Sequence, residues 1–208
     1  MTTPTFSRHV PFSWPKCVGW TLLLLVCLAV AVFSARYLIN PPQTIKQALG
    51  NAFGLPWLVV HVAGSVVALS LGAFQFVPAW RSGKVRAHRW IGRSYVLSCL
   101  VGGVSGVILA MGSFAGPIAT AGFGLLGVGW IAVNLLGWRA AVQRRFDSHR
   151  RWMIRSWALT LAAVTLRIYL PLLIMSDLPF EVGYRAISFL CWVPNLLLAE
   201  WWLRRRQA

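Results

Sequence analysis

The sequence predicts an all-α membrane protein with six transmembrane helices, and three observations support this prediction. Hydrophobic residues make up 58% of the 208-residue chain and charged residues only 12%, a composition typical of proteins that lie in a bilayer. The apolar residues gather in runs that are long enough to span the hydrocarbon. The basic residues gather in the segments between alternate runs, which is the pattern of cytoplasmic loops.

The apolar runs define one transmembrane domain over residues 17–208, preceded by a cytoplasmic tail over residues 1–16. The first run, Cys17 to Ala35, ends in small residues as a cleaved signal peptide does, but its length and its long leading tail favour a retained helix. We expect the six helices at about residues 17–39, 55–80, 90–112, 117–138, 152–175 and 182–203.

Small residues recur every four positions on three consecutive predicted helices, which lets helices approach each other closely. The fifth helix carries a polar and small stripe at steps of three or four residues, so the stripe lies on one face. We therefore expect a tight central four-helix bundle built from two tandem hairpins, helices two and three with helices four and five. The small positions are Gly64, Ala68, Gly72; Ser98, Gly102, Gly106; and Gly116, Thr120, Gly124, and the stripe is Trp152, Ser156, Thr160, Ala163, Arg167.

Other polar residues inside the predicted helices have structural interpretations. Gln75, Asn134 and Asn195 are expected to form interhelical hydrogen bonds. Glu200, near the end of the sixth helix, is expected to pair with an arginine at the same depth, the candidates being Arg139, Arg155 and Arg204.

The formal net charge of +16 is distributed in a way that argues against nucleic-acid binding. The basic residues lie in short loops between apolar runs, where cytoplasmic location and anionic lipid headgroups account for them. This asymmetry places both termini in the cytoplasm. The exceptions are Arg36, Lys46 and Arg185, which fall on the outer side, and Arg167, which falls within the membrane.

The cysteines indicate neither a disulfide framework nor a metal site. Cys17, Cys27, Cys99 and Cys191 fall at the start of or within apolar runs, with no C-x-x-C pair and no cluster with histidine. They are interpreted as small buried hydrophobic residues.

A repeated motif opens the third and fifth predicted helices. HRWIGRSYVL begins at His88 and HRRWMIRSWAL at His149, each with the histidine in a basic loop. Tryptophan suits the headgroup level, and an arginine one turn deeper can return its guanidinium to lipid phosphate. The repetition relates helices two and three to helices four and five as a tandem duplication.

Several motifs in order resemble one bacterial family of integral membrane proteins. LGAFQF, HRWIGRSYV, HRRWMIRSWALT, TLRIYLP and WVPNLLLAE are similar to the family named domain of unknown function 2306, over roughly residues 55–201. The resemblance implies a polytopic bacterial membrane protein and supplies no activity or catalytic residue. We expect the protein in the inner membrane, with several passes through it. The paired histidines give a looser similarity to b561-type cytochromes.

His88 and His149 are candidate ligands of a cofactor. If the hairpins are equivalent, the two imidazoles lie at one depth on neighbouring helices and can ligate a haem b iron, with Arg93 and Arg155 binding its propionates or another anionic ligand. The alternative is that both histidines are interfacial residues that contact lipid phosphate or cap a helix.

His61 and Arg167 form a second candidate site, in the outer third of the membrane. An unpaired arginine that faces lipid is costly, so Arg167 is expected to point into the bundle or toward the outer surface, near His61, Asp177 or Glu181. The functional interpretation is an outer pocket for an anionic or quinone-like ligand, and the structural one is a polar contact between helices.

Three functions remain open, and so does the question of whether the chain is an enzyme. The first is a redox module that binds haem b or a quinone, the second a lipid-binding or assembly protein, and the third a transporter of small solutes. Nothing resembles a nucleophile elbow, a phosphate loop or a metalloprotease helix.

Overall fold

The computed structural model describes residues 14–39, 51, 53–75 and 85–206, and the regular structure within these ranges is helical. Among the described residues, six segments are long and apolar enough to cross a membrane, which confirms the predicted fold class. Two of these segments are each divided into two helices. The helices are α1 (Trp14–Ile39), α3 (Gly54–Gln75), α5 (Val85–Met111), α6 (Pro117–Val142), α7 (Phe146–Thr160), α8 (Ala162–Ile174), α9 (Phe180–Leu190) and α10 (Val193–Arg205).

The helices α5 and α7 begin earlier than the sequence pattern predicts. Both His88 and His149 are therefore helical residues rather than loop residues. The 27 residues of α5 extend for about 40 Å at 1.5 Å per residue, which exceeds the ~30 Å hydrocarbon thickness. Hydropathy detects only the apolar part of such a helix and misses the basic first turns at headgroup level. The end of the second predicted helix, residues 76–80, lies outside the described residues.

The fifth and sixth transmembrane segments are each broken near the middle. α7 and α8 meet at Leu161, and α9 and α10 meet at Cys191 and Trp192. Pro194 explains the second break, because it has no N–H to give to the carbonyl one turn earlier. The predicted bridging role of Asn195 is confirmed, since its Nδ2 donates to Thr165 Oγ1 of α8 at 2.9 Å and to the Cys191 carbonyl at 3.1 Å.

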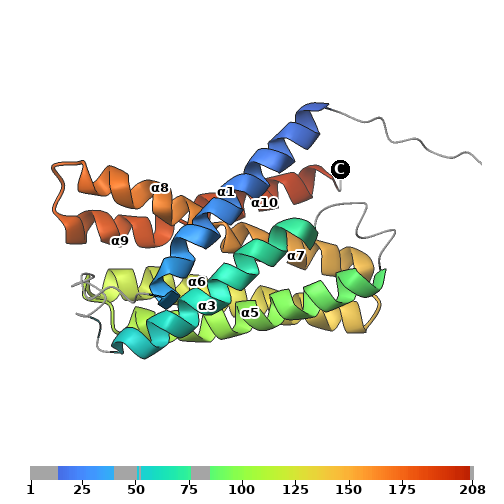
Figure 1. Cartoon of the computed structure of the whole chain (residues 1–208), viewed down its shortest axis with the longest axis horizontal. Helices are drawn as coiled ribbons and strands as arrows, with labels where there is room; N and C mark the ends of the chain where they lie inside the picture. Colours follow the sequence, from blue (N-terminus) through green and yellow to red (C-terminus); the bar gives the residue numbers. More distant parts are fainter. Residues whose placement is uncertain (1–13, 40–50, 52, 76–84, 207–208) are drawn as a thin grey trace, which may run out of the picture.

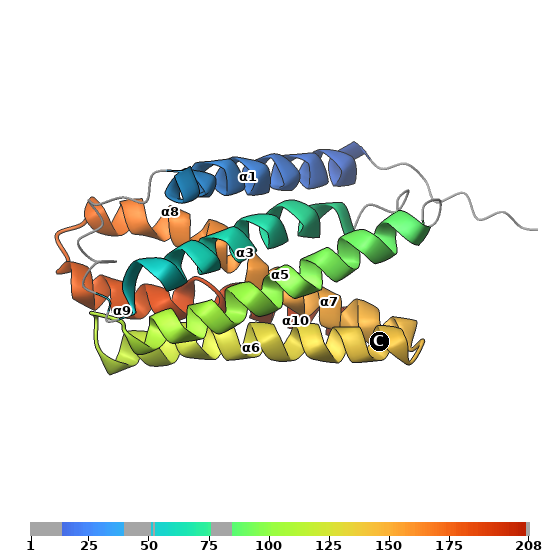
Figure 2. The ribbon, with the colours of Figure 1, turned by 60° about the horizontal axis from the view of Figure 1, so that its bottom comes forward.

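The bundle follows chain order, with α5 packed between α3 and α6, and α6 between α5 and α7. Figure 1 shows α8 and α9 as a hairpin at the end of the molecule away from the C-terminus. Figure 2 shows α1 lying along one side of the bundle, where it packs on α3 and α8. The predicted small-residue contact holds α3 on α5, because a Cβ at Gly64 would come within 2.8 Å of the Gly102 nitrogen and the Ser98 oxygen.

A buried hydrogen-bond network joins α5, α6 and α7 at the centre of the bundle. The Tyr95 hydroxyl lies 2.7 Å from Ser156 Oγ and 2.9 Å from Thr160 Oγ1. Ser156 donates to Asn134 Oδ1 at 3.0 Å, and the Trp130 indole donates to Thr160 Oγ1 at 3.0 Å. All five side chains are buried. The interhelical role predicted for Asn134 is thus confirmed.

We predict that Tyr95→Phe destabilises the bundle. The change removes the hydroxyl that bridges Ser156 and Thr160, and the expected cost is about 1–2 kcal/mol. The free energy of unfolding is measured in detergent micelles by titration with dodecyl sulfate. The matched control is Tyr169→Phe, because the Tyr169 hydroxyl makes no hydrogen bond within the described part of the chain. Equal effects of the two substitutions would contradict a stabilising role for the network.

Candidate functional site

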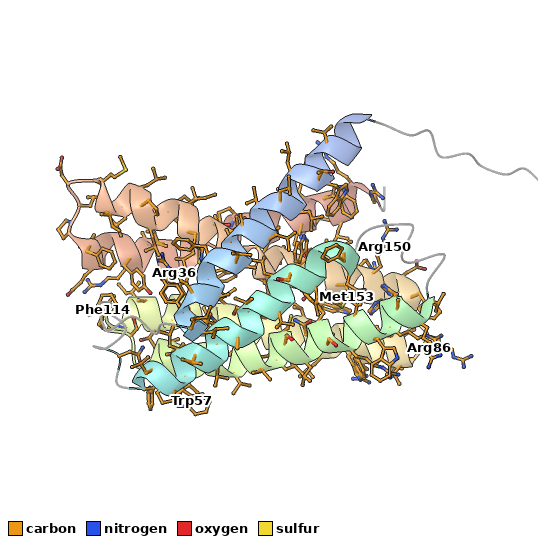
Figure 3. All side chains as sticks on the ribbon, in the orientation of Figure 1. Arg36, Trp57, Arg86, Phe114, Arg150 and Met153 are labelled. Atoms are coloured by element: carbon orange, nitrogen blue, oxygen red, sulfur yellow. The ribbon has the colours of Figure 1, made fainter. Side chains whose placement is uncertain are left out.

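A cavity of about 910 Å³ lies between the helices at one end of the bundle. We call this end the cavity end: α1 ends there, α3 begins, α5 turns into α6, and α8 turns into α9. The basic end is the opposite one, where α5 begins, α6 turns into α7 and α10 ends. Figure 3 shows Arg36 and Phe114, which line the cavity, toward one end, and Arg86 and Arg150 at the other.

The walls of the cavity are mostly apolar, and α1, α3, α5, α6, α7, α8 and α9 all contribute to them. The charged residues among its lining are both arginines, Arg36 and Arg167, and none of the described lining residues is a carboxylate. The other polar lining residues include Ser34, Tyr37, Asn51, His61, Ser65, Ser113, Thr160 and Tyr184. The cavity therefore combines an apolar interior with positive charge.

His61 projects from α3 toward α5 and is held there by its ring nitrogen Nδ1, which lies 2.8 Å from the Gly102 carbonyl oxygen. A carbonyl oxygen only accepts, so Nδ1 carries the proton, and Nε2 of the neutral ring is left as an acceptor. Ser65 Oγ lies 3.4 Å from Nε2. The ring fits because residue 106 is glycine: a Cβ there would come within 3.0 Å of Nδ1.

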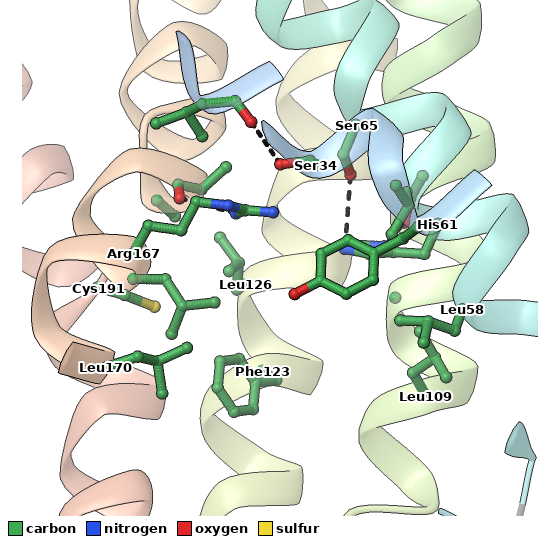
Figure 4. A pocket seen from close by; sticks show the side chains of 18 of the residues that line it. Ser34, Leu58, His61, Ser65, Leu109, Phe123, Leu126, Arg167, Leu170 and Cys191 are labelled. Carbon is green, nitrogen blue, oxygen red and sulfur yellow. Dashed lines mark hydrogen bonds between the residues drawn. The ribbon is translucent and has the colours of Figure 1, made fainter. Parts of the chain in front are cut away.

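Arg167 extends from α8 into the same cavity. Its Nη1 donates to the Ala163 carbonyl of its own helix at 2.9 Å. Figure 4 shows the side chain reaching across the cavity toward the wall that carries His61. Glu181, one of the predicted partners, instead approaches Arg185 at 3.6 Å, with the Glu181 side chain exposed and that of Arg185 partly buried. The structure thus places His61 and Arg167 in the lining of one cavity, and it pairs Glu181 with Arg185 rather than with Arg167.

Two features of the cavity were missed by sequence reasoning. Arg36 and Tyr37 reach it from the end of α1, with Arg36 Nη2 donating to the Tyr37 hydroxyl at 3.3 Å. An aromatic cluster forms another wall: the Tyr184 ring centroid lies 5.3 Å from those of Phe114 and Phe123 and 5.6 Å from that of Phe180. The only sequence signal for either was the outer-side position of Arg36, because the aromatic residues belong to separate segments.

The histidine pair predicted as a haem site lies at the basic end. His149 Nδ1 lies 2.9 Å from the Gly137 carbonyl oxygen of α6, and the backbone carbonyl of His88 accepts from Gln75 Nε2 at 3.4 Å. α6 lies between the helices that carry the two histidines. The structure does not test ligation by this pair, which stays a prediction.

The two arginines of the repeated motif have different surroundings. Arg155 forms a bidentate ion pair with Glu200, with Nε to Oε1 at 2.5 Å and Nη2 to Oε2 at 2.9 Å. Arg93 is exposed, and its guanidinium carbon lies 5.3 Å from the Trp90 ring centroid. The corresponding distance from Arg155 to Trp152 is 4.8 Å. Both copies therefore share a cation–π contact. In the second copy, however, the N–H edge of Arg155 that could bind a propionate is already paired with Glu200.

The comparisons with known proteins identify a family. The family described as "Predicted membrane protein (DUF2306)" matches residues 58–203. No curated protein and no solved structure matches the chain, so the similarity to b561-type cytochromes also stays a prediction. The matched region contains His61, Arg167 and both histidine motifs, and it leaves out α1. Because the match covers well over half of the sequence, the chain belongs to the DUF2306 family of predicted membrane proteins.

Proposed function

We propose that this protein binds an amphiphilic small molecule in the cavity, with the polar head of the ligand at Arg167 and His61. The observation that carries this proposal is a guanidinium inside an apolar cavity whose described lining contains no carboxylate. Burying a charged arginine within a membrane is costly and is typical of functional sites. An anionic or quinone-like head group offers the oxygen acceptors that offset this cost.

The size and lining of the cavity suit such a ligand. Its volume of about 910 Å³ lies within the ~300–1,000 Å³ that is usual for small-molecule sites. Leu58, Leu109, Leu126 and Leu170 line it and are available to an acyl or isoprenoid chain (Figure 4). Arg36 at the end of α1 adds a second cation at the same end.

The distribution of charge supports an outward-facing site in the bacterial inner membrane. The arginines of the α6–α7 turn and of the end of α10 lie at the basic end, whereas Arg36, Arg167 and Arg185 lie toward the cavity end. Basic residues favour the cytoplasmic side. We therefore propose that both termini are cytoplasmic, that the basic end contacts anionic lipid headgroups, and that the cavity lies toward the extracytoplasmic surface.

We predict that Arg167→Gln removes the bound amphiphile. Loss of a charge-assisted hydrogen bond costs about 1.5–3 kcal/mol, which corresponds to a loss of about tenfold or more in affinity. The measurement is mass spectrometry of the lipids that copurify with the protein in detergent. Arg86→Gln is the control, because Arg86 is exposed at the basic end. Identical lipid profiles for the wild type and Arg167→Gln would contradict the proposal.

Haem b binding at His88 and His149 is a second candidate, and one observation favours it. The contact of His149 Nδ1 with the Gly137 carbonyl leaves Nε2 unprotonated in the neutral ring, which is the tautomer that metal ligands use. The ion pair between Arg155 and Glu200 counts against Arg155 as a propionate partner. This site would supply one-electron chemistry, whereas the cavity proposal requires none.

An absorption spectrum of the purified protein tests the haem candidate. The candidate predicts a sharp band in the reduced state, near-stoichiometric haem, and loss of the band in His149→Ala. A colourless protein, expressed with ample haem, would exclude this candidate and leave the cavity proposal intact.

A further inference from the structure

We infer that the head group of the ligand is hydroxylated and aromatic, as in a quinol. One hydroxyl donates to His61 Nε2, and an oxygen of the same head accepts from Arg167. This inference rests on the proposed function, because it takes the cavity to be a site for an amphiphile, and it adds the chemical class of the head group.

The orientation of the His61 ring is fixed by its surroundings. Nδ1 donates to the Gly102 carbonyl at 2.8 Å, and the ring edge lies against Gly106, where a Cβ would come within 3.0 Å of Nδ1 and 3.1 Å of Cε1. The ring therefore cannot exchange the roles of its nitrogens without losing a buried hydrogen bond. His61 presents an acceptor, Nε2, to its remaining surroundings.

The protein satisfies this acceptor poorly. Within the described residues its partner is Ser65 Oγ at 3.4 Å, which is longer than the ~2.7–3.0 Å of a good hydrogen bond to a hydroxyl. A ligand hydroxyl at normal distance would replace a weak contact with a strong one. Ser65 and His61 both line the cavity, so the space beside Nε2 belongs to the ligand site.

Arg167 offers hydrogen-bond donors, the opposite chemistry to that of His61 Nε2. A guanidinium has five N–H donors and no acceptor, and in the described part of the chain its hydrogen bond is the one from Nη1 to Ala163. The site thus combines an acceptor on α3 with donors on α8. A quinol hydroxyl can both donate and accept, so a single head group satisfies both sides.

Acceptor-only head groups fit this pair less well. Arg167 could bind an ionised lipid phosphate or an oxidised quinone. The oxygen lone pairs of either head group would then face the lone pair of His61 Nε2, which is unfavourable. The aromatic wall around Tyr184 adds a reason for a ring, since Phe114, Phe123 and Phe180 surround it at stacking distances and all four side chains line the cavity.

The experiment measures binding to the full chain in lipid nanodiscs under anaerobic conditions. The probes are decylubiquinol, decylubiquinone and a phosphatidic acid, each titrated by calorimetry. We expect decylubiquinol to bind about tenfold more tightly than decylubiquinone, because only the quinol satisfies the Nε2 acceptor. His61→Phe should abolish this preference, because the substitution removes the acceptor that distinguishes the two probes.

A glycine pair gives an independent test that keeps His61 in place. Gly106→Ala places a methyl group against the His61 imidazole and should weaken decylubiquinol binding severalfold. Gly124→Ala is the control: no atom lies within 4 Å of the added Cβ, so the affinity for decylubiquinol should not change. Equal effects of the two substitutions would count against the role given to His61.

The outcomes separate this inference from the proposed function. Equal affinity for decylubiquinol and decylubiquinone, or tighter binding of phosphatidic acid, overturns the hydroxylated head group and leaves an amphiphile site in place. Failure of all three probes to bind, together with lipid profiles that do not respond to Arg167→Gln, overturns both.

Discussion

The bilayer interior offers no water, so polar side chains there must be satisfied by one another, and the network centred on Tyr95 meets this constraint. Tyr95, Asn134 and Ser156 are each at most 2% exposed, and their hydrogen bonds join α5, α6 and α7. Two further members, Trp130 and Thr160, also line the cavity. The network therefore fixes the floor of the site as well as the packing of the bundle.

The polar stripe of the fifth segment connects this core to the cavity. Ser156 and Thr160 belong to the network. Thr160 also lines the cavity, as do Ala163 and Arg167, which lie one and two helical turns after it. The stripe continues across the break at Leu161. The cavity is completed by α1, which lies outside the family match at residues 58–203 and provides Ser34, Arg36 and Tyr37. The matched region thus holds His61 and Arg167, and α1 adds further lining residues from outside it.

Much of the fold and the grouping of His61 with Arg167 could be predicted from the sequence. Hydropathy locates six spans, four-residue spacing locates the contact at Gly64, and alternation of the spans places residues 61 and 167 at one end of the bundle. The aromatic wall and the covering by α1 could not be predicted, because they depend on which non-consecutive helices pack together. The first turns of α5 and α7 were missed because they extend beyond the apolar core, where hydropathy carries no information.

In the proposed site, the cavity selects one amphiphile from the surrounding lipid. The most direct measurement is photo-cross-linking in native membranes with p-benzoylphenylalanine in place of Phe123, which lines the cavity, and in place of Phe146, which is exposed at the basic end. We expect mass spectrometry to find one dominant adduct at position 123 and the bulk lipid mixture at position 146. The same bulk mixture at both positions would contradict it.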